Sequence, residues 1–295
     1  MEMNIFVIGA TGYIGSAIVE RLRVNGHTVL GLARSEQAAA KIHALDAAVW
    51  QGDITNISRL TEAVHETDGV IYTAQSQEAD MLAVERTAVT ALLKALAGSN
   101  KPFIFTSGCG LIGNTGPEGA DENSAPHPPA FFVPRLETET MVVAAAPAVH
   151  TIVIRPALVY GRRAGAFAAL IAAAKKIGAA PYVGGGENHW PTIHVMDVAD
   201  LYVRALEHAP SGSLFHGTNA NPSQVRQIAK AISQAADLAG RTVSWTYEQA
   251  EDKLGLLAGH FLLDQHIKSE NAQRILGWRP AQPGPIEELI QGSYR

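Results

Sequence analysis

Short apolar runs alternate with longer segments of helical periodicity along the first half of the chain. Residues 3–8 are a run of strand type, and residues 12–24 then place Ile14, Ile18 and Leu22 on one helical face. The same pair of patterns recurs, with strands expected at 28–32, 47–50, 70–73, 103–106 and 151–154 and helices at 36–45, 56–66, 78–96 and 134–146. Because these strands are apolar on both faces, the pattern predicts an α/β fold with a doubly wound parallel sheet covered by helices on both sides.

The pattern becomes irregular beyond about residue 160. Residues 184–186 form a glycine turn, and the helices expected in this part are 164–177, 198–207, 223–238 and short ones before Trp278. We therefore expect a sheet domain at residues 1–160 and, interleaved with it, a smaller C-terminal α/β lobe at residues 161–295 that binds substrate against the carboxyl edge of the sheet. Residues 108–134 are rich in Gly, Pro, Asn and Asp, which suits a substrate loop.

Composition excludes several classes of protein. The chain of 295 residues is 47% hydrophobic and 17% charged, which is typical of a folded globule. A net charge of -5 leaves no basic surplus for nucleic acid or an anionic membrane surface. The longest uncharged apolar stretch, residues 166–174, is about half the roughly 18 residues that a membrane span needs. The single cysteine, Cys109, cannot form an intrachain disulfide, and strand-like sequence begins at the N-terminus, so we expect a cytoplasmic protein.

Three glycines stand where the first strand ends and the first helix begins, in the segment 9–15, GATGYIG. Gly9 permits a tight turn, Gly12 lets a pyrophosphate approach the backbone, and Gly15 lets helix and strand pack closely. The amino terminus of the helix adds free N–H groups and the positive end of its dipole. This segment therefore predicts a dinucleotide-binding loop.

The glycine loop and four later segments together resemble the short-chain dehydrogenase/reductase superfamily, in its extended and atypical, epimerase/dehydratase-like branch. Residues 52–54 (GDI) are similar to the turn that contacts adenine, and residues 72–75 (YTAQ) to the motif after the fourth strand. Residues 155–161 (RPALVYG) and 193–199 (IHVMDVA) are similar to two segments near the nicotinamide. The resemblance covers most of the chain and implies a Rossmann fold.

The residue after the second strand favours NADP over NAD as the cofactor. NAD-binding relatives carry a carboxylate here for the ribose hydroxyls, whereas this chain has Ala33 followed by Arg34 and Ser35, which suit a 2′-phosphate. The alternative is a solvated Arg34 with Ser35 as an ordinary helix N-cap. The resemblance implies the cofactor contacts Gly9, Thr11, Gly12, Tyr13, Ile14, Gly15, Arg34, Ser35, Asp53, Ile54, Thr73, Ala74, Gln75, Thr106, Arg135 and Pro156.

The usual catalytic residues of the superfamily are incomplete in this chain. Relatives use a tyrosine acid/base, a lysine four residues later, and a serine or threonine after the fifth strand. The resemblance places Phe131 at the tyrosine and Arg135 at the lysine, where its guanidinium would hold the nicotinamide ribose. Gly108 falls at the serine, although a shift of one residue would bring the hydroxyl of Ser107, or that of Thr106, to the site.

Other residues could supply the missing proton. Tyr160 and His194 lie in the two nicotinamide-side segments and, with Arg135, are our candidate catalytic residues. The alternatives are that Tyr160 is a wall residue, His194 a packing residue and Asp197 a helix N-cap. His189 and His194 have no third ligand at metal spacing, so we expect no metal site.

Two functions remain open at this point. The first is NADPH-dependent reduction of a small carbonyl, enone or sugar-like substrate by a monomer or homodimer. The second is a catalytically silent NADP-binding protein, a redox sensor or partner-binding module, and it is favoured by the missing tyrosine. The substrate contacts that we expect are Gly108, Cys109, Phe131, Tyr160, His189 and Trp190.

Overall fold

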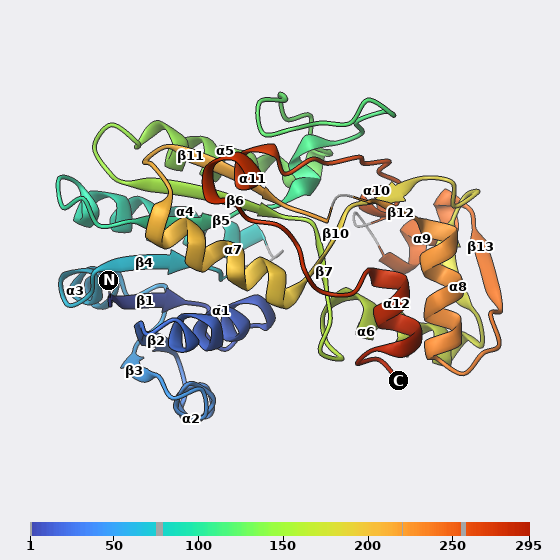
Figure 1. Cartoon of the computed structure of the whole chain (residues 1–295), viewed down its shortest axis with the longest axis horizontal. Coiled ribbons are helices and arrows are strands. Elements are labelled where there is room, and N and C mark those ends of the chain that lie inside the picture. Colours follow the sequence, from blue (N-terminus) through green and yellow to red (C-terminus); the bar gives the residue numbers. More distant parts are fainter. Residues whose placement is uncertain (1, 75–78, 220, 255–257) are drawn as a thin grey trace.

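The computed structural model describes residues 2–74, 79–219, 221–254 and 258–295, and it contains a seven-stranded sheet (Figure 1). Every pairing in this sheet is parallel, and the strand order is β11-β6-β5-β4-β1-β2-β3. The strands are β1 (Asn4–Ile8), β2 (Thr28–Ala33), β3 (Ala48–Gln51), β4 (Gly69–Tyr72), β5 (Phe103–Thr106), β6 (Thr151–Pro156) and β11 (Ser213–Gly217). The order reverses between β1 and β4, so the predicted doubly wound α/β fold is confirmed.

Helices cover both faces of the sheet because successive strand residues point to opposite sides. On β1, Ile5 and Val7 pack toward one core and Phe6 and Ile8 toward the other. The first core is closed by α1 (Tyr13–Val24), α2 (Glu36–His43), α7 (Val195–His208) and α11 (Glu270–Leu276). The second is closed by α3 (Ile57–His65), α4 (Ala79–Leu96) and α5 (Val133–Ala144).

A smaller lobe lies beyond the carboxyl end of β6 and has its own apolar core (Figure 1). Three strand pairs build it, namely β7 (Leu158–Tyr160) with β10 (Thr192–His194), β8 (Ala180–Val183) with β13 (Thr242–Trp245), and β9 (His189–Trp190) with β12 (Ser223–Gln224). Its helices are α6 (Gly165–Ile177), α8 (Val225–Ala235), α9 (Tyr247–Leu254), α10 (Ala258–Phe261) and α12 (Pro285–Gln291). Although they follow residue 160, β11 belongs to the main sheet and α7 packs against that sheet. The sheet domain and the smaller lobe therefore alternate along the sequence.

Several elements differ from the sequence-based expectation, among them β11, the start of α7, and the short strands β7 to β10, β12 and β13 of the smaller lobe. β11 was not predicted, since it is a five-residue edge strand whose last three residues alone are buried. α7 begins at Val195 rather than residue 198, because the His194 side chain accepts a hydrogen bond from the Met196 N–H and caps the helix. No helix in the described ranges is both long and apolar enough to span a bilayer.

A buried ion pair joins the sheet to the helix beside it. Nε of Arg155 on β6 donates to Oε2 of Glu139 on α5 at 3.0 Å, and a second bond joins Nη2 to the other carboxylate oxygen. Nη1 of Arg155 lies 3.4 Å from Nε2 of His216 on β11, whose Nδ1 donates to the Lys268 carbonyl at 3.0 Å. Burial, followed by the adjacent guanidinium, lowers the pKa of His216 to about 4.

Replacing His216 with Asn should flatten the acid side of the stability profile. The imidazole has a pKa near 6.5 when unfolded and about 4 when folded, so between these values the unfolded chain binds the extra proton. The free energy of unfolding of the wild type should therefore fall as the pH drops from 6.5 to 4, by up to about 3 kcal/mol from this residue. Asn can still donate to the Lys268 carbonyl but does not titrate.

Urea unfolding of both proteins between pH 4 and pH 7 measures this difference. Other groups titrate equally in the two proteins, so the difference between the curves isolates His216. Curves that stay parallel across the range would show that His216 is not held neutral in the folded protein.

Candidate functional site

The glycine loop after β1 forms a turn whose backbone is exposed to a large cavity. Gly9 has a φ of 93°, and its carbonyl accepts the Gly12 N–H at 2.9 Å. Gly12 is the N-cap of α1. A Cβ on Gly15 would lie 2.0 Å from the Gly9 carbonyl oxygen, so only glycine allows the helix to approach the strand this closely. The three glycines therefore take the positions that the sequence predicted.

A cavity of about 690 Å³ lies over this loop at the carboxyl ends of β1, β2 and β4. Its lining includes most of the expected cofactor residues, together with Leu32, Ala38, Gly52, Tyr72 and Glu85. The expected residues are Gly9, Thr11, Gly12, Tyr13, Ile14, Gly15, Arg34, Asp53, Ile54, Thr73 and Ala74. Ser35 is instead the N-cap of α2 and accepts the Ala38 N–H at 3.2 Å. Gln75 lies outside the described residues.

The residues present fit a dinucleotide. The backbone around Gly9 and Gly12 makes a cradle without side chains, next to the amino terminus of a 12-residue helix. Arg34 is exposed at the end of β2 and borders the cavity, directly after buried Ala33. The Tyr72 hydroxyl is buried in the wall and has no hydrogen-bond partner among the described residues.

A second cavity, of about 250 Å³, adjoins the first because Ile14 lines both. Its walls are mostly apolar, and they come from β5, from the turn after β6, and from α6 and α10. The lining residues are Ile14, Thr106, Ser107, Gly108, Cys109, Gly110, Phe132, Pro156, Ala157, Leu158, Val159, Ala166, Leu170, Trp190, Pro191, His260, Phe261 and Gln265. The expected contacts Gly108, Cys109 and Trp190, and the expected cofactor contacts Thr106 and Pro156, therefore lie here.

Ser107 directly follows β5, and its hydroxyl has no hydrogen-bond partner among the described residues. The Thr106 hydroxyl is used in the core, where it lies 2.7 Å from the Tyr202 hydroxyl. Gly108 has no side chain, whereas Ser107 belongs to the cavity lining and its Oγ is buried without a partner among the described residues. Cys109 donates its thiol proton to the Arg155 carbonyl, and burial raises its thiol pKa, so it is no nucleophile.

Of the neighbouring phenylalanines Phe131 and Phe132, Phe132 lines this cavity. Both belong to a short 3₁₀ turn, η2 (Ala130–Phe132), and their ring centroids are 3.9 Å apart with the ring planes tilted by 32°. His260 of α10 packs edge-on to Phe132 and also lines the cavity. Its Nδ1 is buried without a partner in the described chain, and burial lowers its pKa, so the ring is neutral. Sequence reasoning missed His260 because no motif surrounds it.

Arg135 is not among the residues that line either cavity. Its Nη1 pairs with Oε2 of Glu85 at 3.0 Å and donates to the Thr106 carbonyl at 3.3 Å. Both side chains are almost fully buried, and burial raises the pKa of Glu85 to about 7 although the guanidinium opposes the shift. Nη2 of Arg135 is buried without a described partner. The structure therefore places Arg135, the expected catalytic and cofactor contact, in a buried ion pair with Glu85.

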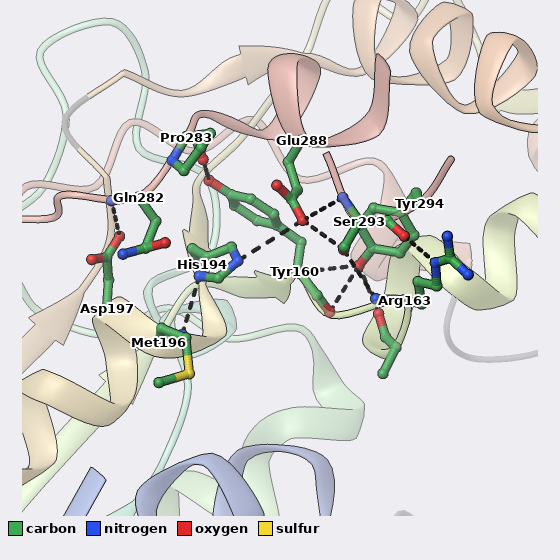
Figure 2. Close-up of polar contacts among 12 residues, drawn as sticks. Tyr160, Arg163, His194, Met196, Asp197, Gln282, Pro283, Glu288, Ser293 and Tyr294 are labelled. Atoms are coloured by element: carbon green, nitrogen blue, oxygen red, sulfur yellow. Dashed lines mark hydrogen bonds and ion pairs between the residues drawn. The ribbon is translucent and has the colours of Figure 1, made fainter. Parts of the chain in front are cut away.

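Tyr160 and His194 belong to a polar network that holds the C-terminal segment, as Figure 2 shows. The Tyr160 hydroxyl donates to the Pro283 carbonyl at 2.6 Å, and Nε2 of His194 faces Oε1 of Glu288 at 4.0 Å. Burial lowers the pKa of His194, so it packs as a neutral N-cap. Asp197 accepts the N–H groups of residues 281 and 282 instead of capping a helix. Neither candidate catalytic side chain lines a cavity.

His189 also lies away from the second cavity. It faces Asp264, with Nδ1 and Oδ1 3.0 Å apart, and its ring centroid is 4.5 Å from that of His266. Asp264 and His266 had not been singled out from the sequence, because more than 70 residues separate them from His189. The expected substrate contacts Phe131, Tyr160 and His189 are thus absent from the lining of the two cavities, whereas Phe132, His260 and Ser107 belong to the wall of the smaller one.

Comparison with known proteins agrees with this geometry. A sequence model of the NAD dependent epimerase/dehydratase family matches residues 5–216. Uncharacterized protein C2A9.02 of Schizosaccharomyces pombe is 33% identical over 299 residues, which are 99% of this chain and 100% of that protein. Sterol-4-alpha-carboxylate 3-dehydrogenase, decarboxylating, of Dictyostelium discoideum is 27% identical over 247 residues, 76% of this chain and 74% of that enzyme.

A solved structure extends the likeness to the whole fold. dTDP-glucose 4,6-dehydratase of Bacillus anthracis, determined in complex with NAD, superposes with a TM-score of 0.82 at 17% identity, covering 98% of this chain and 96% of that one. The chain belongs to the NAD dependent epimerase/dehydratase family, which has the short-chain dehydrogenase type of oxidoreductase fold and binds a nicotinamide dinucleotide.

Proposed function

We propose that this protein reduces a small carbonyl, enone or sugar-like substrate with NADPH. The observation that carries the proposal is the junction of the two cavities at Ile14, with the buried, unpartnered Ser107 hydroxyl in the wall of the smaller one. A dinucleotide in the larger cavity would place its nicotinamide end toward the smaller one. The bound cofactor would supply the hydride, and the chain must supply binding, orientation and a hydrogen-bond donor.

Arg34 supports NADP as the cofactor. It stands at the end of β2, where the ribose of the adenosine half would lie, and no carboxylate precedes it. A guanidinium there can bind a 2′-phosphate with two charge-assisted hydrogen bonds. The glycine cradle would hold the pyrophosphate, and Asp53 and Ile54, which line the same cavity, would border the adenine.

The smaller cavity supports a compact substrate. At about 250 Å³ it lies below the roughly 300–1,000 Å³ of drug-sized ligand sites, and its lining is mainly aliphatic and aromatic. The Ser107 hydroxyl is the group that would donate a hydrogen bond to the carbonyl oxygen as negative charge develops there. Neutral His260 offers a second N–H in the same wall.

Arg135 supports the site by position and charge rather than by proton transfer. A guanidinium keeps its proton at neutral pH, so it cannot act as the superfamily lysine does. Glu85 and the Thr106 carbonyl fix it directly beneath the end of β5. The guanidinium of Arg135 helps to hold the backbone of Thr106, which lines the smaller cavity.

A silent NADP-binding protein is the second candidate function. It is favoured by Phe132, whose ring has no ionisable proton and occupies the cavity wall beside the end of β5. NADPH oxidation measured against a broad carbonyl panel, together with NADPH binding followed by fluorescence, separates the two functions. Tight binding with no turnover on the whole panel would reject the reductase.

Replacing Ser107 with Ala should lower kcat/KM for any accepted carbonyl by about 100- to 1,000-fold, which is the cost of removing one preorganised donor to a developing oxyanion. NADPH affinity should stay unchanged, because Ser107 lines only the smaller cavity. Steady-state kinetics and fluorescence titration measure the two quantities.

Ser233→Ala is the matched control for Ser107. Ser233 on α8 is fully buried with an unpartnered hydroxyl, but it lies in the core of the smaller lobe. Equal loss of activity in both variants would assign the effect to packing and remove Ser107 from the mechanism.

Replacing Arg34 with Ala should weaken NADPH binding by about 1.5–3 kcal/mol, the value of a hydrogen bond to a charged group, and leave NADH nearly unaffected. Calorimetric titration of both nucleotides against wild type and variant measures this selectivity. Equal losses for the two nucleotides would contradict the assignment of Arg34 to the 2′-phosphate.

Replacing Gly12 with Val should abolish binding of both nucleotides while the fold persists. The backbone of Gly12, with a φ of -74°, accepts a side chain, and a Cβ there would lie 3.2 Å from the Gly9 carbonyl oxygen. The added methyl groups would instead occupy the space of the pyrophosphate. Circular dichroism checks the fold, and a variant that binds NADPH like the wild type would refute the location of the phosphates.

A further inference from the structure

Two extended segments, β9 and residues 263–267, lie side by side next to the smaller cavity and bring three side chains that can bind metal close together. The Gln265 N–H donates to the His189 carbonyl at 3.0 Å, which joins residues 263–267 to β9. Residues 263, 265 and 267 are buried, while Asp264 and His266 are half-buried. Side chains alternate along such a segment, so Gln265 reaches the cavity wall and Asp264 and His266 lie on the opposite side with His189.

The distances among these side chains match a metal coordination sphere. Oδ1 of Asp264 lies 3.0 Å from Nδ1 of His189 and 3.7 Å from Nε2 of His266, and one ligand atom of each residue lies within 4.8 Å of the other two. With bonds of about 2.0–2.2 Å, a tetrahedral ion separates its ligand atoms by roughly 3.3–3.6 Å. Both distances from Asp264 are within about 0.3 Å of this range, and the separation of the two imidazole ligand atoms, within 4.8 Å, would have to close by up to about 1.5 Å around one ion.

The backbone already holds these ligands in place. The Asp264 N–H donates to Oδ1 of Asn114 and the His266 N–H to Oγ1 of Thr115, each at 2.8 Å. The Asp264 carboxylate also accepts the His189 N–H at 2.7 Å. The three side chains are 25–43% exposed, which leaves an open side where water can complete the coordination.

We propose that His189, Asp264 and His266 bind one divalent transition-metal ion of the Zn²⁺ type. Two imidazoles and one carboxylate suit Zn²⁺ and Co²⁺ better than Mg²⁺ or Ca²⁺, which prefer oxygen ligands. The ion would join β9 to residues 263–267. Trp190 of β9 and Gln265 of the second segment both line the smaller cavity. Its role is thus to stiffen that wall, and the site is independent of whether the protein turns over a carbonyl.

Co²⁺ titration of untagged, chelator-treated full-length protein tests the proposal. We expect one Co²⁺ per chain, seen as the visible absorption of a four- or five-coordinate cobalt centre, and displacement of the cobalt by Zn²⁺. Zn²⁺ should also raise the melting temperature of the wild type. Asp264→Asn and His266→Ala should each abolish both the absorption and the thermal shift while circular dichroism stays native.

His208→Ala provides the control, because His208 is an exposed histidine that also lies beside a carboxylate, at 3.6 Å from Glu207. It should bind Co²⁺ as the wild type does. Absence of a cobalt spectrum in the wild type would leave only a histidine–aspartate hydrogen bond and reject the site. A spectrum that survives in both ligand variants, or that is lost in His208→Ala, would place the ion elsewhere and equally overturn the proposal.

Discussion

The buried ion pair between Arg155 and Glu139 determines how the carboxyl edge of the sheet is built. It joins β6 to α5, and the carbonyl of Arg155 accepts the Cys109 thiol proton, so the turn after β5 is tied to the same residue. Removing either partner would leave an uncompensated buried charge, which typically costs about 3–5 kcal/mol. Cys109 and Pro156, which both line the smaller cavity, are therefore held in place by this ion pair.

The sequence predicts the sheet and the conformation of the glycine loop well because their causes are local. Branched apolar runs define β1, β4 and β5 within a residue or two of their observed bounds. The roles of Gly9 and Gly15 follow from the few residues around them, since a turn and a close helix approach need no distant partner. The edge strand β11 escapes the same reasoning because its five residues, SLFHG, contain only two large apolar side chains.

The smaller cavity could be predicted only in part, because its side chains depend on offsets and on distant segments. Whether Phe131 or Phe132 lines it is decided by the single 3₁₀ turn before α5, which the helical period does not reveal. His260 reaches the cavity from α10, about 150 residues after Ser107, with no motif of its own. Asp264 and His266 likewise meet His189 only through the pairing of two extended segments.

The change from lysine to arginine at position 135 alters the chemistry open to this site. A lysine there could lower the pKa of a neighbouring phenol, whereas Arg135 stays charged and is bound by Glu85. Burial raises the pKa of Glu85, and the guanidinium of Arg135 opposes that shift. A phenol at position 131 would also stand outside the cavity wall, one residue from Phe132. In the proposed reductase, Ser107 would therefore act as a hydrogen-bond donor and His260 would be the candidate for proton transfer, since the guanidinium of Arg135 cannot take that part.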